Sequence, residues 1–453
     1  MTPGVSAVAP SGLPPARDVT FVIFLGNRST NPERFSPPLA RVGTLPILLR
    51  TILAAQKTDP AEIVVVVDPT TKQSVHANLG RTGRLPESVR WIEVQADASA
   101  AERLRLVVSQ TDSQRLVLVD GGTTYHPSLI RKAAEGNDDA VLALTSLDRA
   151  AGIYALPLDV HDFAGRCPGE FLAPGELDAS LAAISLRSME VSDDLWQRVT
   201  TEEDRRMAER KLDRWLVKPT DGMYAQFNRR ISIPISRQLI KFPITANMVS
   251  LFTLGVGFFS AVFFALGGYW NTLFGAFLCL FASILDGCDG EVARLKLLES
   301  DFGCWLETVC DYLFYFFLLV GMTIGQWRTS GSKAYLLWGA LLLLGALASF
   351  LAVGWQRQRL AAGRPEQLLG IWHNHAESRP SNPFLYAARH MEFIVRRCFF
   401  PYALVVFALL NIMNVAFVLS VIGANLVWPV ALYSSNIFAG VRRAAVVTPM
   451  AAE

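Results

Sequence analysis

Apolar and polar positions follow two different patterns along this chain, and the change falls near residue 240. Before it, short runs of branched apolar residues alternate with segments whose apolar residues recur at helical spacing. We expect strands at 19–25, 62–68, 91–94, 116–120 and 140–145, with helices between them that include 45–55 and 100–109. This alternation predicts an α/β domain with a largely parallel sheet over residues 18–200.

Long apolar runs dominate the part of the chain after residue 244. Each run is near the ~20 residues that a helix needs to cross the hydrocarbon of a bilayer. We place six of them near 246–268, 270–290, 304–325, 334–355, 399–415 and 417–438. Lys and Arg gather between the second and third runs, between the fourth and fifth, and after the sixth, which marks these sides as cytoplasmic. The pattern predicts an all-α domain of six transmembrane helices in the cytoplasmic (inner) membrane, with both termini cytoplasmic.

The segments outside these two regions are short. Residues 1–17 are rich in Pro, Ala and Ser, and we expect them to be disordered. They show no signal-peptide pattern, so we expect the α/β domain to stay in the cytoplasm. Residues 201–243 combine a charged helix with a stretch that suits a helix in the membrane interface and equally an ordinary connecting helix. The transmembrane domain is expected over 244–440, and a C-terminal tail over 441–453.

Net charge and cysteine spacing narrow the classes of partner. The formal net charge of +2 lacks the basic excess of a nucleic-acid-binding protein, so no nucleic-acid partner is expected. The 6 Cys show neither disulfide nor zinc-site spacing. They fit free thiols in a reducing compartment.

Four acidic residues lie within or at the edge of the second and third predicted membrane helices: Asp286, Asp289, Glu307 and Asp311. A charged group at bilayer depth costs roughly 2.5–3.5 kcal/mol on insertion scales, so four of them need a neutralising partner. Spacings of three and four residues put each pair on one helix face. Oxygen ligands alone favour a hard dication, Mg²⁺ or Mn²⁺. The alternative is that these acids are membrane-edge residues paired with Arg294 and Lys296, without a metal.

The acids belong to a longer pattern. From Asp286 the sequence reads DGCDGEVAR, and after eight further residues Gly303, Glu307 and Asp311 follow at intervals of four. This pattern resembles the signature of the CDP-alcohol phosphotransferase family, which has two Asp, a Gly, an Ala-Arg pair, a second Gly and two further Asp. Glu307 departs from it, since the family has Asp there, and the added methylene bears on metal geometry. The resemblance covers about 220–440 and includes FPITANMVS (242–250), similar to the family's I-T-P-N segment with Ala246 in place of Pro.

The resemblance implies a membrane enzyme that moves a substituted phosphate group from a CDP-linked donor, a CDP-alcohol or CDP-diacylglycerol, to an alcohol hydroxyl, releasing CMP. It implies that Asp286, Asp289 and Glu307 hold metal, and that Asp311 binds metal or acts as the general base. It further implies a homodimer among membrane lipids. The residues that it places at the donor nucleotide are Gly290, Ala293, Arg294 and Gly303.

The acceptor stays open between an inositol phosphate and a lipid head group. An acceptor that carries phosphate needs a basic pocket, for which we single out Arg357, Arg359 and Arg389. Orientation of the membrane helices accounts for these arginines equally. Arg294 has two interpretations as well, because it either contacts a phosphate or pairs with an acid such as Glu291.

The two-domain arrangement resembles that of bifunctional cytidylyltransferase / di-myo-inositol-phosphate-phosphate synthases, in which a Rossmann-like sugar-nucleotidyltransferase domain precedes the membrane transferase. The catalytic positions of that domain are altered here. Its entry loop has one Gly and carries Pro37-Pro38 where Lys-Pro is usual, and its D-V-D metal motif reads Arg198-Val199-Thr200. Asp120 remains as a lone candidate acid.

We therefore expect the α/β domain to be inactive and kept for folding, dimerisation or regulation. The alternative for this domain is a different nucleotide-binding function with altered ligands. For the whole chain, an ion-coupled transporter and an inactive membrane scaffold stay as alternatives to the transferase, because intramembrane acids also mark ion pathways.

Overall fold

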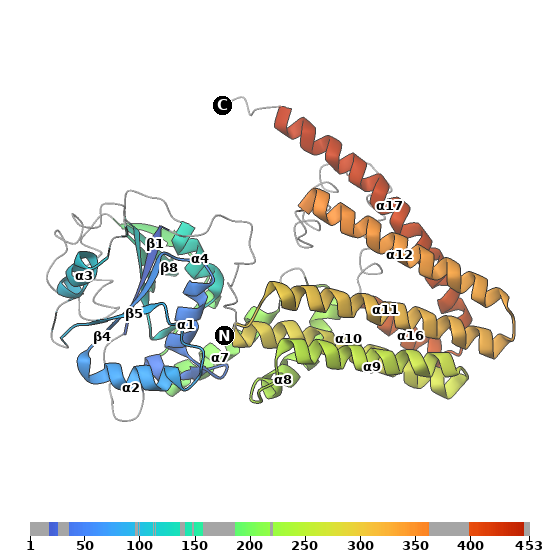
Figure 1. The fold of residues 1–453 in the computed structure, drawn as a ribbon, viewed down its shortest axis with the longest axis horizontal. Helices are drawn as coiled ribbons and strands as arrows, with labels where there is room; N and C mark the ends of the chain where they lie inside the picture. The colour runs from blue at the N-terminus through green and yellow to red at the C-terminus, as the bar shows by residue number, and fades with distance from the viewer. Residues whose placement is uncertain are drawn as a thin grey trace, which may run out of the picture. The chain divides into compact units, whose positions relative to one another are not determined.

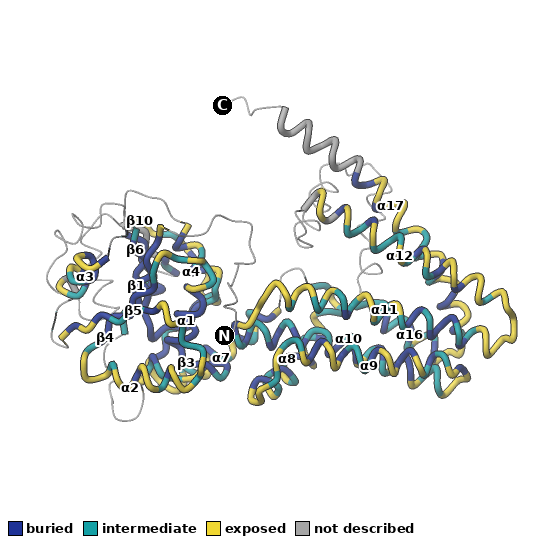
Figure 2. Tube along the Cα trace, in the orientation of Figure 1, coloured by how far each residue is buried: buried dark blue, intermediate teal, exposed yellow. Residues whose placement is uncertain are grey.

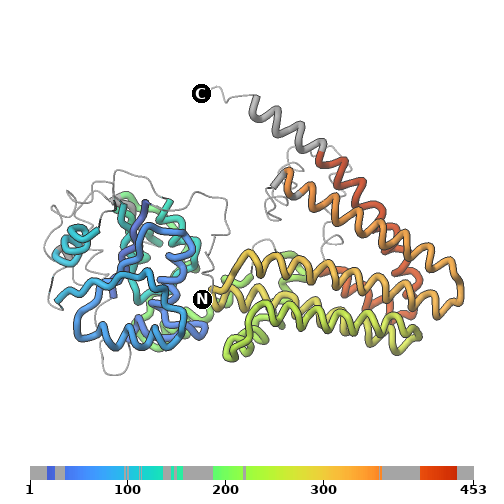
Figure 3. The backbone as a smooth tube through the Cα atoms, viewed as in Figure 1, coloured from blue at the N-terminus to red at the C-terminus, as the bar shows by residue number. Residues whose placement is uncertain are grey.

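The structure is a computed structural model that describes residues 18–25, 36–95, 98, 100–111, 113, 115–135, 141–146, 149–156, 186–217, 221–361 and 398–447. The chain divides into two compact units, which are taken separately below (Figure 1). The first contains Met1–Val217 together with Arg237–Pro243 and Val292–Asp301. The second contains Lys218–Ser236, Ile244–Glu291 and Phe302–Glu453. Figure 3, coloured by residue number, lets the reader follow the backbone through both.

The first unit is built on a seven-stranded sheet in the order β10-β8-β9-β6-β1-β4-β5. The strands are β1 (Val19–Phe24), β4 (Glu62–Val67), β5 (Val89–Glu93), β6 (Arg115–Asp120), β8 (Val141–Ser146), β9 (Arg149–Ala155) and β10 (Leu186–Glu190). β1 is parallel to both of its neighbours, β4 and β6, whereas β9 is antiparallel to β6 and β8. The five expected strands are present within two residues of their predicted ends, so the predicted α/β fold with a largely parallel sheet is confirmed.

Apolar residues cover both faces of this sheet, as expected for central parallel strands. Phe21 and Ile23 of β1 face the cluster formed with α1 (Ile47–Gln56), α2 (Pro69–Gly80) and α4 (Pro127–Glu135). Val22 faces the opposite cluster, to which α3 (Ala100–Ser109) contributes. The continuous run of branched residues in β1 follows from this double burial.

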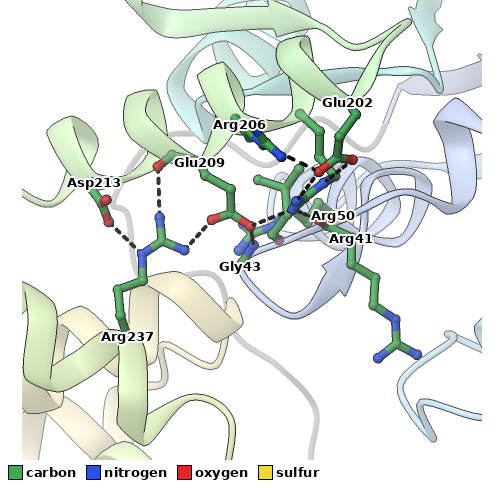
Figure 4. Close-up of polar contacts among 10 residues, drawn as sticks. Arg41, Gly43, Arg50, Glu202, Arg206, Glu209, Asp213 and Arg237 are labelled. Atoms are coloured by element: carbon green, nitrogen blue, oxygen red, sulfur yellow. Dashed lines mark hydrogen bonds and ion pairs between the residues drawn. The ribbon is translucent and has the colours of Figure 1, made fainter.

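Shorter elements complete the first unit: η1 (Pro37–Leu39), the pair β2 (Arg41–Val42) and β3 (Leu45–Pro46), the pair β7 (Thr123–Tyr125) and β11 (Trp196–Arg198), η2 (Asp193–Leu195) and α7 (Glu202–Leu216). Thr201 and Asp204 form a capping box at the start of α7. Figure 4 shows how α7 is held by charge. Glu209 accepts hydrogen bonds from Gly43 N at 2.9 Å and from Arg237, whose Nε donates to Asp213 at 2.6 Å.

Two arginines of the first unit cap the end of α10 (Tyr269–Lys296). Arg50 donates to Val42 O at 2.6 Å and to Leu295 O, and Arg84 donates to Lys296 O and to Leu297 O. Guanidinium groups there satisfy open carbonyls and oppose the negative end of the helix dipole. Burial lowers the pKa of Arg50 to about 10. Leu297 itself adopts φ +53° and is buried in the apolar cluster of β1 and α1, so this turn is part of the first unit's core.

The second unit is helical. Its helices are α8 (Met223–Leu239), α9 (Ala246–Leu266), α10, α11 (Asp301–Ser330), α12 (Ala334–Ala361), α16 (Phe399–Leu409) and α17 (Met413–Val447), of which α8, α10 and α11 extend by a few residues into the first unit. Five segments of the described part are long and apolar enough to cross a membrane: Ala246–Leu266, Tyr269–Lys296, Asp301–Ser330, Ala334–Gln356 and Met413–Ser435. The predicted span at 399–415 corresponds to α16, which has 11 residues and falls short of the length needed. Six spans are therefore not confirmed.

Small residues allow α9 and α11 to approach closely. Gly321 and Gly325 stand four apart on α11, and a Cβ on them would lie 2.3 Å from Ala261 O and 2.0 Å from Phe264 O. Such Gly-x-x-x-Gly faces are typical of membrane helices packed at the backbone. α12 and α17 instead pair through polar groups, with Ser349 Oγ donating to Ala424 O at 2.7 Å.

Many residues of these helices are exposed, as the yellow segments in Figure 2 show. Large apolar residues are among them. Examples that are at least half exposed are Phe252, Phe259, Leu344, Leu347 and Leu351. Exposed apolar surface on this scale marks contact with a membrane or a partner. It therefore agrees with membrane-spanning helices.

Candidate active site

The four acids singled out above lie on two consecutive helices of the second unit. Asp286 and Asp289 are in the last three turns of α10, and Glu307 and Asp311 are in the first three turns of α11. Both helices continue through these positions because they are flanked by helix-compatible apolar residues. Spacings of three and four residues keep each pair on one face of its helix.

Asp289 is the most enclosed of the four. It is 4% exposed, whereas Asp286, Glu307 and Asp311 are half-buried. Ser250 Oγ of α9 donates to Asp289 Oδ2 at 2.6 Å, and Gly290 N donates to Oδ1 at 2.5 Å. Hydrogen bonds to both oxygens orient the carboxylate. Ser250 lies in the FPITANMVS stretch, and sequence reasoning had assigned it no role.

Asp289 experiences electrostatic repulsion from acidic residues of both helices. Asp286 and Glu307 are close enough for their charges to repel that of Asp289. Cys310, the next turn of α11 after Glu307, also lies within electrostatic reach of Asp286 and Asp289. One face of α11 therefore shares a site with the acidic face of α10. The structure brings Asp286, Asp289 and Glu307 together, and Asp311 follows one turn after Glu307.

The donor set fits a hard dication in its chemistry, because it consists of carboxylate oxygens whose mutual repulsion calls for a counter-charge. Among the described residues, no three or more His, Cys, Asp or Glu side chains lie close enough together to coordinate one metal ion.

The remaining predicted positions are spread over three places. Gly290, Ala293 and Arg294 follow Asp289 along α10, and Gly303 precedes Glu307 on α11. Arg357 and Arg359 belong to the last turns of α12, where the Arg359 guanidinium lies 4.8 Å from the centre of the Trp355 ring. Arg389 lies outside the described residues.

An apolar groove of about 610 Å³ runs between α11 and α12. Tyr312, the neighbour of Asp311, contributes to one part of its lining, and Trp355 and Gln358 contribute to another. Phe316, Leu347 and Leu351 form much of its wall. The groove residues Tyr312, Phe316 and Leu319 lie on roughly the opposite face of α11 from Glu307 and Asp311.

Asp120 of the first unit has a different environment. Its Oδ1 accepts from Gly122 N at 3.0 Å, its Oδ2 accepts from Thr123 Oγ1 at 2.6 Å, and Arg198 Nε lies 3.9 Å from Oδ2. Burial raises the pKa of Asp120, while these hydrogen bonds and the guanidinium oppose the rise. Arg198 thus lies beside Asp120, at the position that corresponds to the first Asp of the D-V-D metal motif discussed in the sequence analysis.

Comparison with known proteins bears on the second unit. Residues 243–371 match the family model described as CDP-alcohol phosphatidyltransferase. This segment, which includes all four acids, is similar to the CDP-alcohol phosphatidyltransferase family. The family resemblance carried by the Asp286–Asp311 pattern is thereby confirmed.

Relatives with this domain include the bifunctional IPC transferase and DIPP synthase of Archaeoglobus fulgidus, 32% identical over 155 residues, which are 34% of this chain and 31% of the relative. The protein of the same name from Rubrobacter xylanophilus is 26% identical over 332 residues, covering 71% of this chain and 67% of the relative. The Archaeoglobus match thus spans about a third of that relative's length. Among solved structures, the inositol-1-phosphate CTP transferase from T. maritima matches 42% of this chain and 95% of its own, with 10% identity and a TM-score of 0.35.

Proposed function

We propose that this protein transfers a substituted phosphate group from a CDP-linked donor to the hydroxyl of an alcohol acceptor and releases CMP. The observation that carries the proposal is the cluster of Asp286, Asp289 and Glu307 on two apolar helices, inside the segment that matches the CDP-alcohol phosphatidyltransferase model. Buried like charges of this kind are expensive unless they serve a bound cation or substrate.

The carboxylates Asp286, Asp289, Glu307 and Asp311 are the residues that would hold Mg²⁺ or Mn²⁺. When bound, such an ion neutralises the diphosphate of the donor. Asp289 supplies a fixed ligand because Ser250 and Gly290 orient both of its oxygens. Gly290, Ala293, Arg294 and Gly303 would contact the donor nucleotide.

The bond that forms joins the acceptor oxygen to the phosphorus that carries the donor's alcohol. The bond that breaks joins this phosphorus to the oxygen that leaves with CMP. Asp311 would accept the proton of the acceptor hydroxyl, one turn away from Glu307 on α11. Phosphoryl transfer depends mainly on such positioning and charge neutralisation.

Two acceptor classes remain candidates. An inositol phosphate agrees with the names of the relatives, and it would use Arg357, Arg359 and Arg389 as phosphate contacts. A lipid head group is the second candidate, and the apolar groove between α11 and α12 has a lining that suits an acyl chain. Competition between a soluble and a lipid acceptor in the CMP assay would distinguish them.

The cellular setting belongs to the same proposal. We place the second unit in the cytoplasmic (inner) membrane with both termini cytoplasmic, which requires a sixth crossing that includes the short helix α16, and we expect a homodimer surrounded by lipid. α8 would lie in the interface, since Met223, Phe227 and Ile231 form an exposed apolar stripe on it. The α/β domain would be catalytically inactive.

The test is CMP release by the purified full chain, offered a panel of CDP donors and alcohol acceptors with Mg²⁺ or Mn²⁺. Asp289→Asn should abolish release, because an amide keeps the shape and the Ser250 hydrogen bond but loses the charge. Asp301→Asn is the matched control, since Asp301 is exposed at the start of α11 and should leave release unchanged.

Thermal unfolding in detergent would show that both variants fold. Wild-type-like release by folded Asp289→Asn would contradict the site. No release by the wild-type protein with any donor would favour the transporter or scaffold.

A further inference from the structure

Glu291 is a buried charge that the proposed reaction does not use. It lies on α10 two residues after Asp289, and its side chain is fully buried. Its Oε1 accepts hydrogen bonds from Arg229 Nη1 at 2.6 Å and from Ser232 Oγ at 2.5 Å, and its Oε2 accepts one from Ser236 Oγ at 2.6 Å. A buried carboxylate is tolerated when it is paired and its lone pairs are satisfied in this way.

All three donors come from one face of α8. Ser232 and Ser236 stand four residues apart and are buried, whereas Phe227 and Ile231 are exposed on another face of the helix. Arg229 is itself fixed at its other end, because its Nε donates to Asp221 Oδ2 at 3.3 Å. α8 therefore presents polar groups to α10, the reverse of an ordinary amphipathic helix on a globular core.

Arg229 also reaches the backbone of the turn that carries the acids. Its Nη1 donates to Gly287 O at 3.0 Å, directly after Asp286. A Cβ on Gly287 would lie 2.9 Å from Nη1 of Arg229 and 3.5 Å from Ser232 Oγ. Gly287 thus provides the space that the guanidinium occupies, which gives a reason for glycine inside the D-G-C-D sequence.

We propose that Arg229, held by Glu291, is a positioning residue that fixes the turn of α10 bearing Asp286 and Asp289. The inference rests on the proposed function, because it assumes that these two acids serve the reaction. Arg229 is not itself one of the proposed metal ligands. It acts through the backbone at Gly287 and through the buried carboxylate, in the way that outer hydrogen bonds orient the ligands of a metal site.

Two conservative variants test this clamp, by which we mean Arg229 together with its hydrogen bonds to Gly287 O and Glu291. Arg229→Lys keeps the positive charge but loses the planar group that bridges Gly287 O, Glu291 and Asp221. Gly287→Ala keeps every member of the cluster and displaces the guanidinium with one methyl group. Ser260→Ala is the matched structural control, since Ser260 is buried on α9 and donates to Gly275 O of the same α10 at 2.7 Å, eleven residues before Asp286.

Both test variants should lower kcat for CMP release by about 10–100-fold and raise the half-saturating Mg²⁺ concentration, with KM for the donor changed far less. Ser260→Ala should lower the thermal stability without either kinetic change. A second readout, the rise in unfolding temperature on adding Mn²⁺, does not depend on turnover. It should be weakened in Arg229→Lys and Gly287→Ala and retained in Ser260→Ala.

The inference is overturned if the folded test variants keep wild-type kcat, Mg²⁺ requirement and Mn²⁺ response. It is also overturned if their losses match those of Ser260→Ala and follow stability alone. Failure of the proposed function looks different, because the wild-type protein would then release no CMP with any donor. The Mn²⁺ comparison still decides whether the clamp positions the acids in that case.

Discussion

Because α9 and α11 approach closely, we expect glycine-to-alanine substitutions at Gly321 and Gly255 to change the free energy of unfolding in opposite directions. In Gly321→Ala the new methyl group would lie 2.3 Å from Ala261 O, about 1.1 Å short of the 3.4 Å at which ordinary contact begins. The obstacle is a backbone carbonyl, which cannot rotate away as a side chain can. Gly255 of α9 has no atom within 4 Å of the corresponding position, so Gly255→Ala meets open space.

The magnitudes decide the expected outcome. Overpacking of this kind costs about 1–3 kcal/mol, and the better helix propensity of Ala returns at most about 1 kcal/mol. With the full propensity gain, we expect Gly321→Ala to lower the free energy of unfolding by up to about 2 kcal/mol. Gly255→Ala should leave it unchanged or raise it by up to about 1 kcal/mol, since only the propensity term applies.

The assay is unfolding in mixed micelles, followed by tryptophan fluorescence. CMP release should change less than stability, because Gly321 lies ten residues, about 15 Å along the helix, beyond Asp311. Equal stability of Gly321→Ala and Gly255→Ala would refute the inferred backbone contact between α9 and α11. Gly325→Ala, with its methyl group 2.0 Å from Phe264 O, should be at least as destabilising as Gly321→Ala.

Three further predictions concern single positions. Glu307→Asp restores the ligand usual in the family, so CMP release should persist with a changed Mg²⁺/Mn²⁺ preference, and a folded but inactive variant would show another role for Glu307. Leu297→Gly should lower the stability of the first unit by about 1–3 kcal/mol in thermal unfolding. Loss of the buried side chain costs about 2–5 kcal/mol, and relief of the left-handed backbone offsets about 1–2 kcal/mol of that cost. A gain in stability would contradict this prediction. The full chain should release no pyrophosphate from CTP with inositol 1-phosphate or glycerol 3-phosphate, because Arg198 stands beside Asp120; release that is lost in Asp120→Asn would show an active site there.

Sequence patterns predicted the parts of the fold that depend on local order. Continuous branched runs such as 62–67 became central strands, and apolar stretches of twenty or more residues became long helices. β9, β10 and β11 were missed, because their sequences are mixed or short, and the partners of β10 and β11 lie far along the chain. The predicted fifth span, 399–415, was too long. Its apolar run continues almost without a break into the predicted sixth span, and the sequence therefore hides the turn after α16.

The acidic site was predictable for a physical reason. Carboxylates in apolar helices stand out, and their three- and four-residue spacing specifies a shared face. Their supports do not stand out in the same way. Ser250 and Arg229 are ordinary residues in sequence, and their partners lie 39 and 62 positions away. Glu291 was visible as an acid, but its pairing with α8 required the tertiary structure.

The first unit includes the turn that follows α10 in its core. Arg198 supplies a single positive charge beside Asp120 where a nucleotidyltransferase would need a dication held by several acids. The sheet of the same unit has nonetheless kept its buried core, and that core includes Leu297 from the turn after α10. Arg50 and Arg84 cap the same helix end, and both contribute charges that a nucleotide reaction does not require. The core of the α/β unit thus includes the turn between α10 and α11, the two helices that carry the acidic residues, which supports the proposal that the domain serves folding.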